Sequence, residues 1–559
     1  MNDAVADLDP HVRAGWTPRG AADAGLPAHA AAWLTGRIGP TSGATPVAAD
    51  STLAVPEPAL SASVLAALVE AVGPRHVLTD RAARLARAGG LSYLDLMRRR
   101  GAGEPPVPDA VVCPADPAQV QRVVSLCAEH GVGLVPFGGG TSVVGGVQAL
   151  RGGHGAVLVL DLVRLNRLVA VDAVSRLAVL QAGLTAPAAD RLLAAHGLTV
   201  GHVPQSYERA TIGGFAATRS SGQQSAGYGR FEDMVEGLRL STPRGELRLG
   251  VAPASAAGPD LKQLVVGSEG AFGVITEVTL RVRPLPVAER HEGFVVDGWA
   301  AGQDLVRELA QARVAADVTR LSDPAETEVG LRLRGGLTGA LLRRYLAARG
   351  IADPCLLILG WHGATGEELA VRRSATLRVM RGHRVVRLGR RAGEAWRHGR
   401  FAGPRQRDAL MDAGVCVETL ETAGYWSRLS ALRDAVRAAL TEELTGPGRT
   451  PVVGCHISHS YETGASLYFT VLVPRDVSDP IGQWRRAKAA ACAAIGSSDR
   501  DGPLGHDGPL GTISHHHAVG VDHAPYLPAE VGALGVDVLR AVKRELDPTG
   551  VLNPGKLIS

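Results

Sequence analysis

The segment Val135–Gly146 (VPFGGGTSVVGG) constrains this chain more than any other, because it places three consecutive glycines directly after a short apolar strand. Gly138, Gly139 and Gly140 have no Cβ atom, so their backbone N–H groups can turn toward one point and approach an anion closely. The threonine and serine that follow add hydroxyl donors. The segment predicts a phosphate-binding loop; on glycine content alone, a flexible surface loop is the alternative.

A helix and a strand are predicted in front of this loop. Asp116 is suited to cap the helix and Pro117 to open it, apolar residues recur at helical spacing, and Gly131 follows its end. Leu134 and Val135 then continue as a buried strand. Neither G-x-x-x-x-G-K-[ST] nor a helix-opening G-x-G-x-x-G is present, so neither common nucleotide-binding motif accounts for the loop.

Composition is that of a globular protein with more than one domain. The 559 residues, 45% hydrophobic and 20% charged, suffice for two or more cores. The 59 basic and 55 acidic residues leave a net charge of +4, which gives no reason to expect nucleic acid. Six scattered cysteines without C-x-x-C spacing argue against disulfides and zinc and favour a reducing cytoplasm. Without a signal peptide or an apolar run of membrane-spanning length, any membrane contact is expected to be peripheral, at the inner face.

Two further segments share the small, polar character of the first loop. The stretch from His202 to Asp233 is too long and too polar for an ordinary connection, which indicates a loop that wraps around a ligand. Gly267–Gly273 (GSEGAFG) runs directly into a strand with period-two alternation. Prolines end that strand, and a second domain of mixed strands and helices is expected to start near Val287. A flexible insertion is expected at residues 496 to 510.

Taken together, the three glycine-rich segments and the tail Asp547–Lys556 (DPTGVLNPGK) resemble the vanillyl-alcohol oxidase/p-cresol methylhydroxylase family of flavoproteins over residues 75 to 559. The resemblance implies an α+β fold, with a two-subdomain p-cresol methylhydroxylase-type FAD-binding domain, a mixed α/β cap domain for the substrate and a helical N-terminal arm. We expect the arm and helical region at 1–105, the FAD-binding domain at 106–286 and the cap domain at 287–510. The histidine segment and a tail that returns to the FAD-binding domain are expected at 511–559.

The resemblance also implies noncovalently bound FAD, held by four segments. The expected cofactor-binding residues are Pro136, Phe137, Gly138, Gly139, Gly140, Thr141, Ser142, Pro204, Gln205, Ser206, Tyr207, Glu208, Arg209, Ala210, Thr218, Arg219, Ser220, Ser221, Gly267, Ser268, Glu269, Gly270, Ala271, Phe272 and Gly273.

Within that family, Gly511–Gly520 (GTISHHHAVG), Arg407-Asp408 and Cys455–Gly464 resemble the alkyldihydroxyacetonephosphate synthase branch. The resemblance implies exchange of the acyl chain of acyl-dihydroxyacetone phosphate for a long-chain alcohol, which makes an ether lipid precursor without net redox change. Flavin N5 is expected to hold the substrate carbon while the carboxylate leaves. The expected partners are these two lipids, a membrane surface and a second copy of the chain in a homodimer.

Four residues are expected to carry the proton chemistry. The resemblance assigns the acid/base role to Tyr461; a phenol near its ordinary pKa of about 10 is neutral at pH 7, so nearby histidines are expected to lower that pKa. A buried structural tyrosine is the alternative. In a strand, His515 and His517 would share a face while His516 points away. A histidine run can also bind metal, but the resemblance favours proton transfer and no metal.

Two arginines are candidates for the substrate's phosphate. Arg407 matches the branch's substrate-binding arginine, whose forked donors suit phosphate, and Arg320 is a second candidate. For both, a solvated arginine is the alternative. The neighbouring Tyr425 and Trp426 are expected in the core.

Two other functions remain open at this stage. An FAD-dependent dehydrogenase or oxidase of D-2-hydroxy acids would share the cofactor frame but pass electrons to an acceptor. A flavin-binding scaffold without turnover is the third possibility. The histidine run and the context of Tyr461 favour the synthase.

Overall fold

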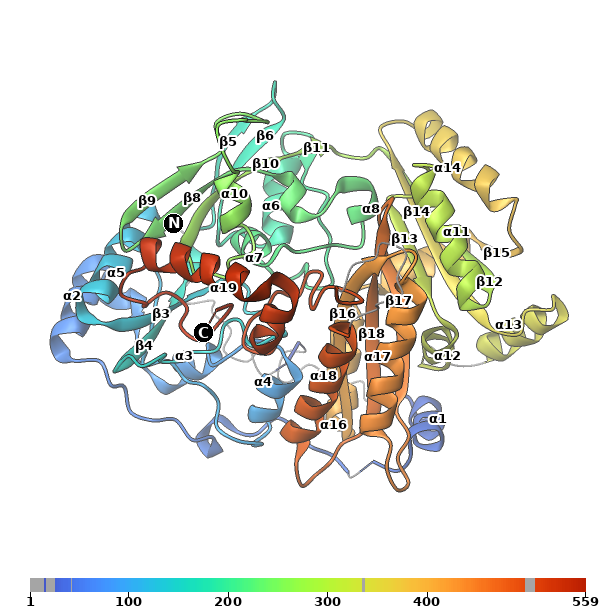
Figure 1. Cartoon of the computed structure of the whole chain (residues 1–559), viewed down its shortest axis with the longest axis horizontal. Helices are drawn as coiled ribbons and strands as arrows, with labels where there is room; N and C mark the ends of the chain where they lie inside the picture. Colours follow the sequence, from blue (N-terminus) through green and yellow to red (C-terminus); the bar gives the residue numbers. More distant parts are fainter. Residues whose placement is uncertain (1–14, 17–25, 42, 334–336, 498–507, 559) are drawn as a thin grey trace.

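A computed structural model describes residues 15–16, 26–41, 43–333, 337–497 and 508–558. Figure 1 shows two lobes: most of the blue-to-green part of the chain forms one and the yellow-to-orange part forms the other, while the blue helix α1 lies against the second lobe. We call them the first domain and the cap domain. Part of the expected N-terminal arm and the centre of the expected insertion lie outside the described residues, and one helix of the arm, α1 (Ala28–Ile38), is described.

The first domain begins with a four-stranded sheet in the order β1-β2-β4-β3, in which β2, β4 and β3 run parallel. Its elements are β1 (Val77–Leu78), β2 (Ala110–Val112), β3 (Val132–Phe137) and β4 (Ala156–Asp161), with α2 (Ala62–Val72), α3 (Arg81–Ala86), α4 (Tyr93–Arg98) and α5 (Pro117–His130). The side chain of Asp116 accepts from the N–H of Gln119, and left-handed Gly131 ends α5. The predicted unit of helix, strand and glycine loop is therefore confirmed.

An antiparallel sheet in the order β5-β6-β10-β8-β9 forms the second half of the first domain. Its strands are β5 (Leu168–Asp172), β6 (Leu177–Gln181), β8 (Val235–Thr242), β9 (Gly245–Leu249) and β10 (Val274–Arg281). The other elements are α6 (Ala186–Ala194), β7 (Leu198–Thr199), α7 (Ile212–Thr218), α8 (Ser225–Tyr228), α9 (Phe231–Met234), α10 (Leu261–Val265) and β11 (Arg283–Pro284). One apolar core joins both sheets, with buried members from α5, β4, β6 and β10.

The cap domain is built on a seven-stranded sheet in the order β15-β12-β14-β13-β17-β18-β16. Its strands are β12 (Ala288–Asp297), β13 (Val318–Ser322), β14 (Pro354–Gly363), β15 (Val385–Gly389), β16 (Val415–Tyr425), β17 (Val452–Ser460) and β18 (Gly464–Pro474). Its helices are α11 (Trp299–Gln311), α12 (Pro324–Leu333), α13 (Leu337–Ala348), α14 (Gly366–Met380), α15 (Arg390–Gly399), α16 (Gly403–Asp412), α17 (Leu429–Leu444) and α18 (Pro480–Ile495). The long antiparallel pairing of β16 with β18 brings together segments that are distant in the sequence, and β17 pairs with β18 as a hairpin.

The C-terminal segment returns to the first domain, as the red ribbon in Figure 1 shows. After α19 (Leu527–Leu546), the N–H of Leu134 in β3 donates to Val551, and the N–H of Asn553 donates to Leu134. The side-chain amide of Asn553 donates to the carbonyls of Gly146 and Glu269. The tail thereby ties two of the glycine-rich segments together.

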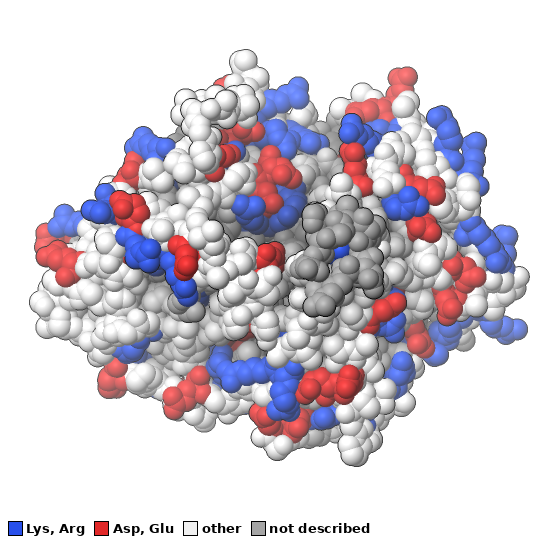
Figure 2. Space-filling model, viewed as in Figure 1, with Lys and Arg blue, Asp and Glu red and all other residues white. Residues whose placement is uncertain are grey.

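On the face in Figure 2, basic and acidic side chains are interspersed over both lobes. All six cysteines are buried and free, as their spacing predicts. No helix among the described residues has the length and apolarity needed to cross a bilayer.

Candidate active site

The first glycine loop lies against the start of α7. A Cβ atom at Gly138 would be 2.3 Å from Oγ1 of Thr211, and one at Gly139 would be 2.2 Å from the carbonyl oxygen of Arg209. The side chain of Thr211 in turn accepts from the N–H of Gly214 at 3.2 Å. Only glycine permits this approach, so the two segments form a cradle walled by backbone, which suits an anionic group.

A cavity of about 600 Å³ extends from this cradle into the cap domain. Of the expected cofactor-binding residues, those that line it are Pro136, Phe137, Gly138, Gly139, Gly140, Thr141, Ser142, Pro204, Gln205, Ser206, Ala210, Thr218, Ser220, Ser221, Glu269, Gly270 and Gly273. The cap domain contributes both expected substrate arginines, and the C-terminal segment contributes two of the three histidines of the run. The segments predicted from sequence therefore meet around one cavity.

The remaining expected cofactor-binding residues lie behind the cavity wall and hold it in place. Arg219 donates to the carbonyls of Val266 and Gln263, and Tyr207 donates to Asp190 at 2.7 Å. Glu208 and Arg209 both contact Trp16. Gly267 and Ser268 bond through their backbone N–H groups, and Ala271 and Phe272 pack in an apolar cluster with α19.

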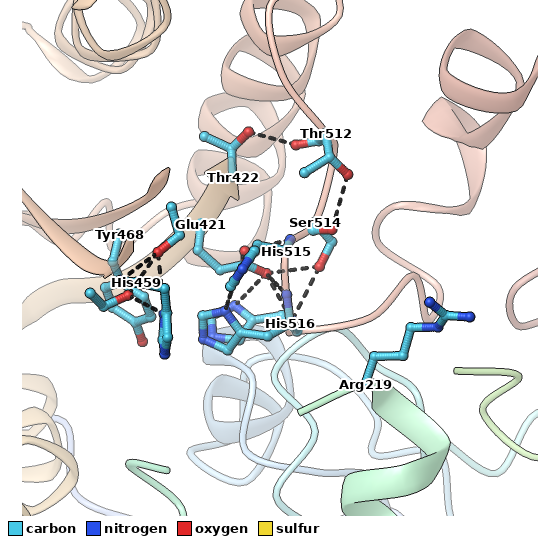
Figure 3. A network of polar contacts seen from close by, with 12 residues as sticks. Arg219, Glu421, Thr422, His459, Tyr468, Thr512, Ser514, His515 and His516 are labelled. Carbon is cyan, nitrogen blue, oxygen red and sulfur yellow. Dashed lines mark hydrogen bonds and ion pairs between the residues drawn. The ribbon is translucent and has the colours of Figure 1, made fainter. Parts of the chain in front are cut away.

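The three histidines form a turn around the carboxylate of Glu421, a residue of β16 (Figure 3). The backbone N–H groups of His515, His516 and His517 donate to this carboxylate at 2.6, 3.1 and 2.8 Å, and the hydroxyl of Ser514 donates at 2.8 Å. The expectation of a strand with His516 pointing away is wrong. The backbone curls because three successive N–H groups converge on one anion.

Contacts on both sides of the expected insertion fix the position of this turn. Glu530 of α19 accepts from the hydroxyl of Thr512 and the N–H of Ile513, at 2.7 and 2.8 Å. The N–H of Leu510 donates to the carbonyl of Ser497 at 3.0 Å, which closes the chain on either side of residues 498–507. Those ten residues lie outside the described part of the chain. The anchors of the histidine turn thus come from β16 and α19.

A chain of hydrogen bonds leads from Tyr461 to the cavity. The Tyr461 hydroxyl is 2.5 Å from Nε2 of His515, and Nδ1 of His515 is 2.9 Å from Nδ1 of His516. His516 and His517 line the cavity, while Tyr461 and His515 lie behind them. The imidazoles of His515 and His516 therefore connect the Tyr461 hydroxyl to the cavity.

Burial decides the protonation of this cluster. It raises the pKa of Tyr461 above its ordinary value, and Arg230 lowers it only in part. The expectation that nearby histidines lower the phenol's pKa is wrong, because burial also lowers the pKa of His516 to about 3 and leaves that ring neutral. Burial alone raises the pKa of Glu421, but the imidazoles and the backbone donors outweigh it and hold that pKa well below the usual value.

The two candidate arginines differ in how many of their guanidinium donors are already engaged. Arg407 donates to the carbonyl of Leu91 at 2.8 Å and approaches Glu418 at 3.4 Å, and its buried Nε has no hydrogen-bond partner among the described residues. Arg320 is committed to Glu326 at 2.6 Å and also contacts both ring nitrogens of His456. Arg407 therefore has the greater capacity for a ligand.

Sequence reasoning assigned no role to several polar residues at this site. Besides Glu421, these are His456, stacked on Tyr468 at 4.9 Å, and His459, whose Nε2 is 2.5 Å from the carbonyl of Gly222. His456, His459 and Tyr468 line the cavity. Polar residues in otherwise apolar strands could have marked them as candidates. Their roles could not be predicted, because their partners come from other parts of the chain.

Glu421, His515 and His516 also have the geometry of a cation site, with ligand atoms within 4.8 Å of one another. Their atoms are already engaged, because the carboxylate accepts from the turn and the two imidazoles face each other. The expectation of no metal stays a prediction.

Comparison with known proteins identifies the family. Residues 108–250 match the family model described as FAD binding domain, and residues 285–557 match FAD linked oxidases, C-terminal domain. The alkyldihydroxyacetonephosphate synthase of Trypanosoma brucei brucei is 30% identical over 535 residues, which cover 93% of this chain and 84% of that protein. This chain belongs to the alkyldihydroxyacetonephosphate synthase family. The Dictyostelium discoideum synthase is 29% identical, with 87% and 79% covered.

Solved structures agree with this assignment. A structure of alkyldihydroxyacetonephosphate synthase superimposes with a TM-score of 0.79 at 26% identity, over 94% of this chain and 92% of that one. A mitochondrial D-lactate dehydrogenase [cytochrome] of Arabidopsis thaliana is also 27% identical, over 81% of this chain and 74% of that protein. The chain is an FAD-dependent enzyme of the synthase type.

The cavity suits FAD on its own geometry. Its wall includes Gly138 and Gly139, where a Cβ atom would clash with the neighbouring segment, and its volume is in the range of ordinary ligand sites. The buried hydroxyl of Ser221, in the third expected segment, has no hydrogen-bond partner within the described chain. Residues 136–142, 204–206 and 218–221 would hold the cofactor.

Gly139→Ala is expected to give a protein that purifies without FAD. The added methyl group would lie 2.2 Å from the carbonyl oxygen of Arg209, and backbone cannot swing away as a side chain can. The ratio of flavin to protein absorbance measures the loss. Gly155→Ala, where a Cβ meets nothing within 4 Å, is the control and should keep its flavin. A normal flavin content in Gly139→Ala would exclude this loop as the cradle.

The unfolding free energy is expected to fall as the pH drops below about 6.5. Burial lowers the pKa of His202, His459 and His516 to about 3 and that of His517 to about 4. These rings stay neutral in the folded state while the unfolded chain takes up protons, at about 1.4 kcal/mol per pH unit for each ring. Denaturant titrations from pH 8 to pH 5 measure the slope, which His516→Asn should reduce. A flat profile would contradict these pKa directions.

Proposed function

We propose that this enzyme exchanges the acyl chain of acyl-dihydroxyacetone phosphate for a long-chain alcohol. The observation that carries the proposal is the chain Tyr461–His515–His516, which reaches a cavity shared by the FAD cradle and the cap domain. Replacing an ester by an ether at one carbon breaks the bond to that carbon, so simple acyl transfer cannot achieve it. The reaction needs proton donors and acceptors at the carbon and a hold on the phosphate.

The hydrogen-bond directions follow from the neutral state of each group. Tyr461, a neutral phenol, donates to Nε2 of His515; neutral His515 then carries its proton on Nδ1 and donates to Nδ1 of His516. The remaining proton of His516 lies on Nε2 of a ring that lines the cavity. We propose that this relay delivers a proton to the leaving group, with Tyr461 as its source, and runs in reverse when the alcohol arrives.

Arg407 is proposed to hold the substrate's phosphate, because its planar donors suit that group and its Nε is unsatisfied. FAD bound in this cavity would supply a nucleophilic nitrogen for the substrate carbon. Arg320, neutralised by Glu326, is proposed to line the site.

An apolar wall in the cap domain suits a substrate with a long alkyl chain. The apolar residues of the cap domain that line the cavity are Val329, Leu331, Leu356, Ile358, Trp396, Leu410, Val417, Val452 and Leu472. A substrate that partitions into lipid also supports transient docking at a membrane surface, which cosedimentation with phospholipid vesicles would detect.

The deciding experiment follows the flavin spectrum of the purified enzyme without oxygen. Palmitoyl-dihydroxyacetone phosphate is expected to bleach the flavin and release palmitate, and hexadecanol should restore the spectrum with formation of an ether. D-Lactate is the second arm, chosen because of the similarity to a D-lactate dehydrogenase. Bleaching by D-lactate alone, reversed only by an electron acceptor, would replace the synthase proposal by a D-2-hydroxy acid dehydrogenase. No response to either would leave a flavin-binding scaffold.

A further inference from the structure

Arg400, which follows α15, lines the same cavity and has no assigned role. Its Nη1 atom is buried and has no hydrogen-bond partner within the described chain. Three arginines line the described cavity wall, and the other two have carboxylate partners, Arg320 with Glu326 and Arg407 with Glu418. Arg400 alone of the three has no carboxylate of the described residues within ion-pair distance.

The surroundings hold Arg400 beside the second FAD segment. Its guanidinium lies 5.0 Å from the ring centre of Phe401, and Phe401 stacks on Tyr207 with ring centres 5.7 Å apart. Gln205 of the same segment approaches Gly403, at the start of α16. The cap domain therefore presents this cation at the point where it meets residues 204–207.

The charge of Arg400 is not compensated where it lies. Burial lowers its pKa, Glu289 raises it from a distance, and Arg397 lowers it further. A guanidinium keeps its charge in proteins, and a buried charge without a partner costs free energy. A bound anion would remove that cost, and the position on the cavity wall gives an anion access.

We propose that Arg400 binds a phosphate group inside the cavity, either the diphosphate of FAD or the phosphate of the substrate. Both ligands bring this group to the cavity, and a guanidinium offers it two parallel donors. The cofactor version rests on the family assignment alone. The substrate version rests on the proposed function.

The test uses Arg400→Gln, Arg400→Lys and, as a matched control, Arg397→Gln. Arg397 lies one turn earlier in α15, pairs with Glu394 at 2.9 Å and is not part of the cavity wall. FAD and riboflavin are titrated into each flavin-free protein, and dihydroxyacetone phosphate and inorganic phosphate into each flavin-loaded protein. Flavin fluorescence or absorbance gives the Kd values, and thermal unfolding confirms that each variant is folded.

If Arg400 binds the cofactor, Arg400→Gln should weaken FAD roughly 10- to 100-fold and leave riboflavin unchanged, the usual loss for a charge-assisted hydrogen bond. If it binds the substrate, the affinities for dihydroxyacetone phosphate and inorganic phosphate should fall by a similar factor while FAD is unaffected. Arg400→Lys should restore part of either loss, and Arg397→Gln should match the wild type. Changes below twofold in every titration would overturn the proposal. None of these readouts needs turnover, so a failure of the synthase assay is a separate result.

Discussion

Tyr461→Phe is expected to reduce alkyl exchange by a factor of about 100 or more while FAD stays bound, since proton transfer by a positioned group contributes about 10²- to 10⁴-fold. The substitution removes only the hydroxyl that donates to His515. His515 then has no proton source behind it, and the relay can no longer refill His516. Ether formation from palmitoyl-dihydroxyacetone phosphate and hexadecanol, at saturating concentrations of both, measures the loss.

The control is Tyr425→Phe in the neighbouring strand. The expectation that Tyr425 lies in the core is wrong, because its side chain is 56% exposed at the end of β16; the adjacent Trp426 is buried, as expected. Removing the Tyr425 hydroxyl should leave the rate unchanged. A Tyr461→Phe enzyme with full activity would remove Tyr461 from the reaction and require His516 or His517 to exchange protons with solvent directly.

Several elements could be predicted because their signals are local. The helix expected between Asp116 and Gly131 is α5, and the alternating strand expected after Gly267–Gly273 is β10. Asp116 caps α5 by accepting from the N–H of Gln119, an interaction between residues that are close together in the sequence. The glycine loop could also be predicted, because a close approach of two backbone segments requires glycine.

The histidine turn could not be predicted, because the interaction that shapes it is not local. Glu421 lies 94 residues before His515 in the chain, and nothing in the GTISHHHAVG segment shows that a carboxylate will meet its backbone. Period-two reasoning therefore placed the histidines on a strand. Only the pairing of β16 with β18 brings Glu421 to this place.

The prediction that histidines lower the pKa of Tyr461 failed for a related reason. The sequence shows many histidines near the tyrosine but not how deeply the fold buries them. Burial disfavours charge on phenol and imidazole alike, so the expected cations are absent and the phenol stays neutral. The proposed relay is therefore built from neutral groups and does not use a phenolate.

Glu421 is the residue on which this relay depends without touching substrate, so we regard it as a positioning residue. Its carboxylate accepts from three consecutive N–H groups and one hydroxyl, and the side chain is buried. Removing it would leave the turn with buried donors, each costing about 1 to 3 kcal/mol when unsatisfied. The turn would relax, and the 2.9 Å contact between His515 and His516 would be lost.

Glu421→Gln is therefore expected to lower kcat at least as much as Tyr461→Phe, because an amide places a donor against backbone donors and misaligns the whole relay. The expected loss of unfolding free energy is about 2 to 5 kcal/mol, because some of the four buried donors stay unsatisfied at about 1 to 3 kcal/mol each. Ser514→Ala, which removes one of the four donors, should show a smaller loss of both, and Glu462→Gln on an exposed ion pair should show neither. Enzyme assays and denaturant titrations on the same samples separate the two effects. Wild-type kcat in a folded Glu421→Gln enzyme would mean that the histidines hold their geometry without the carboxylate. The stiffness of the GTISHHHAVG backbone, rather than the Glu421 carboxylate, would then position the relay.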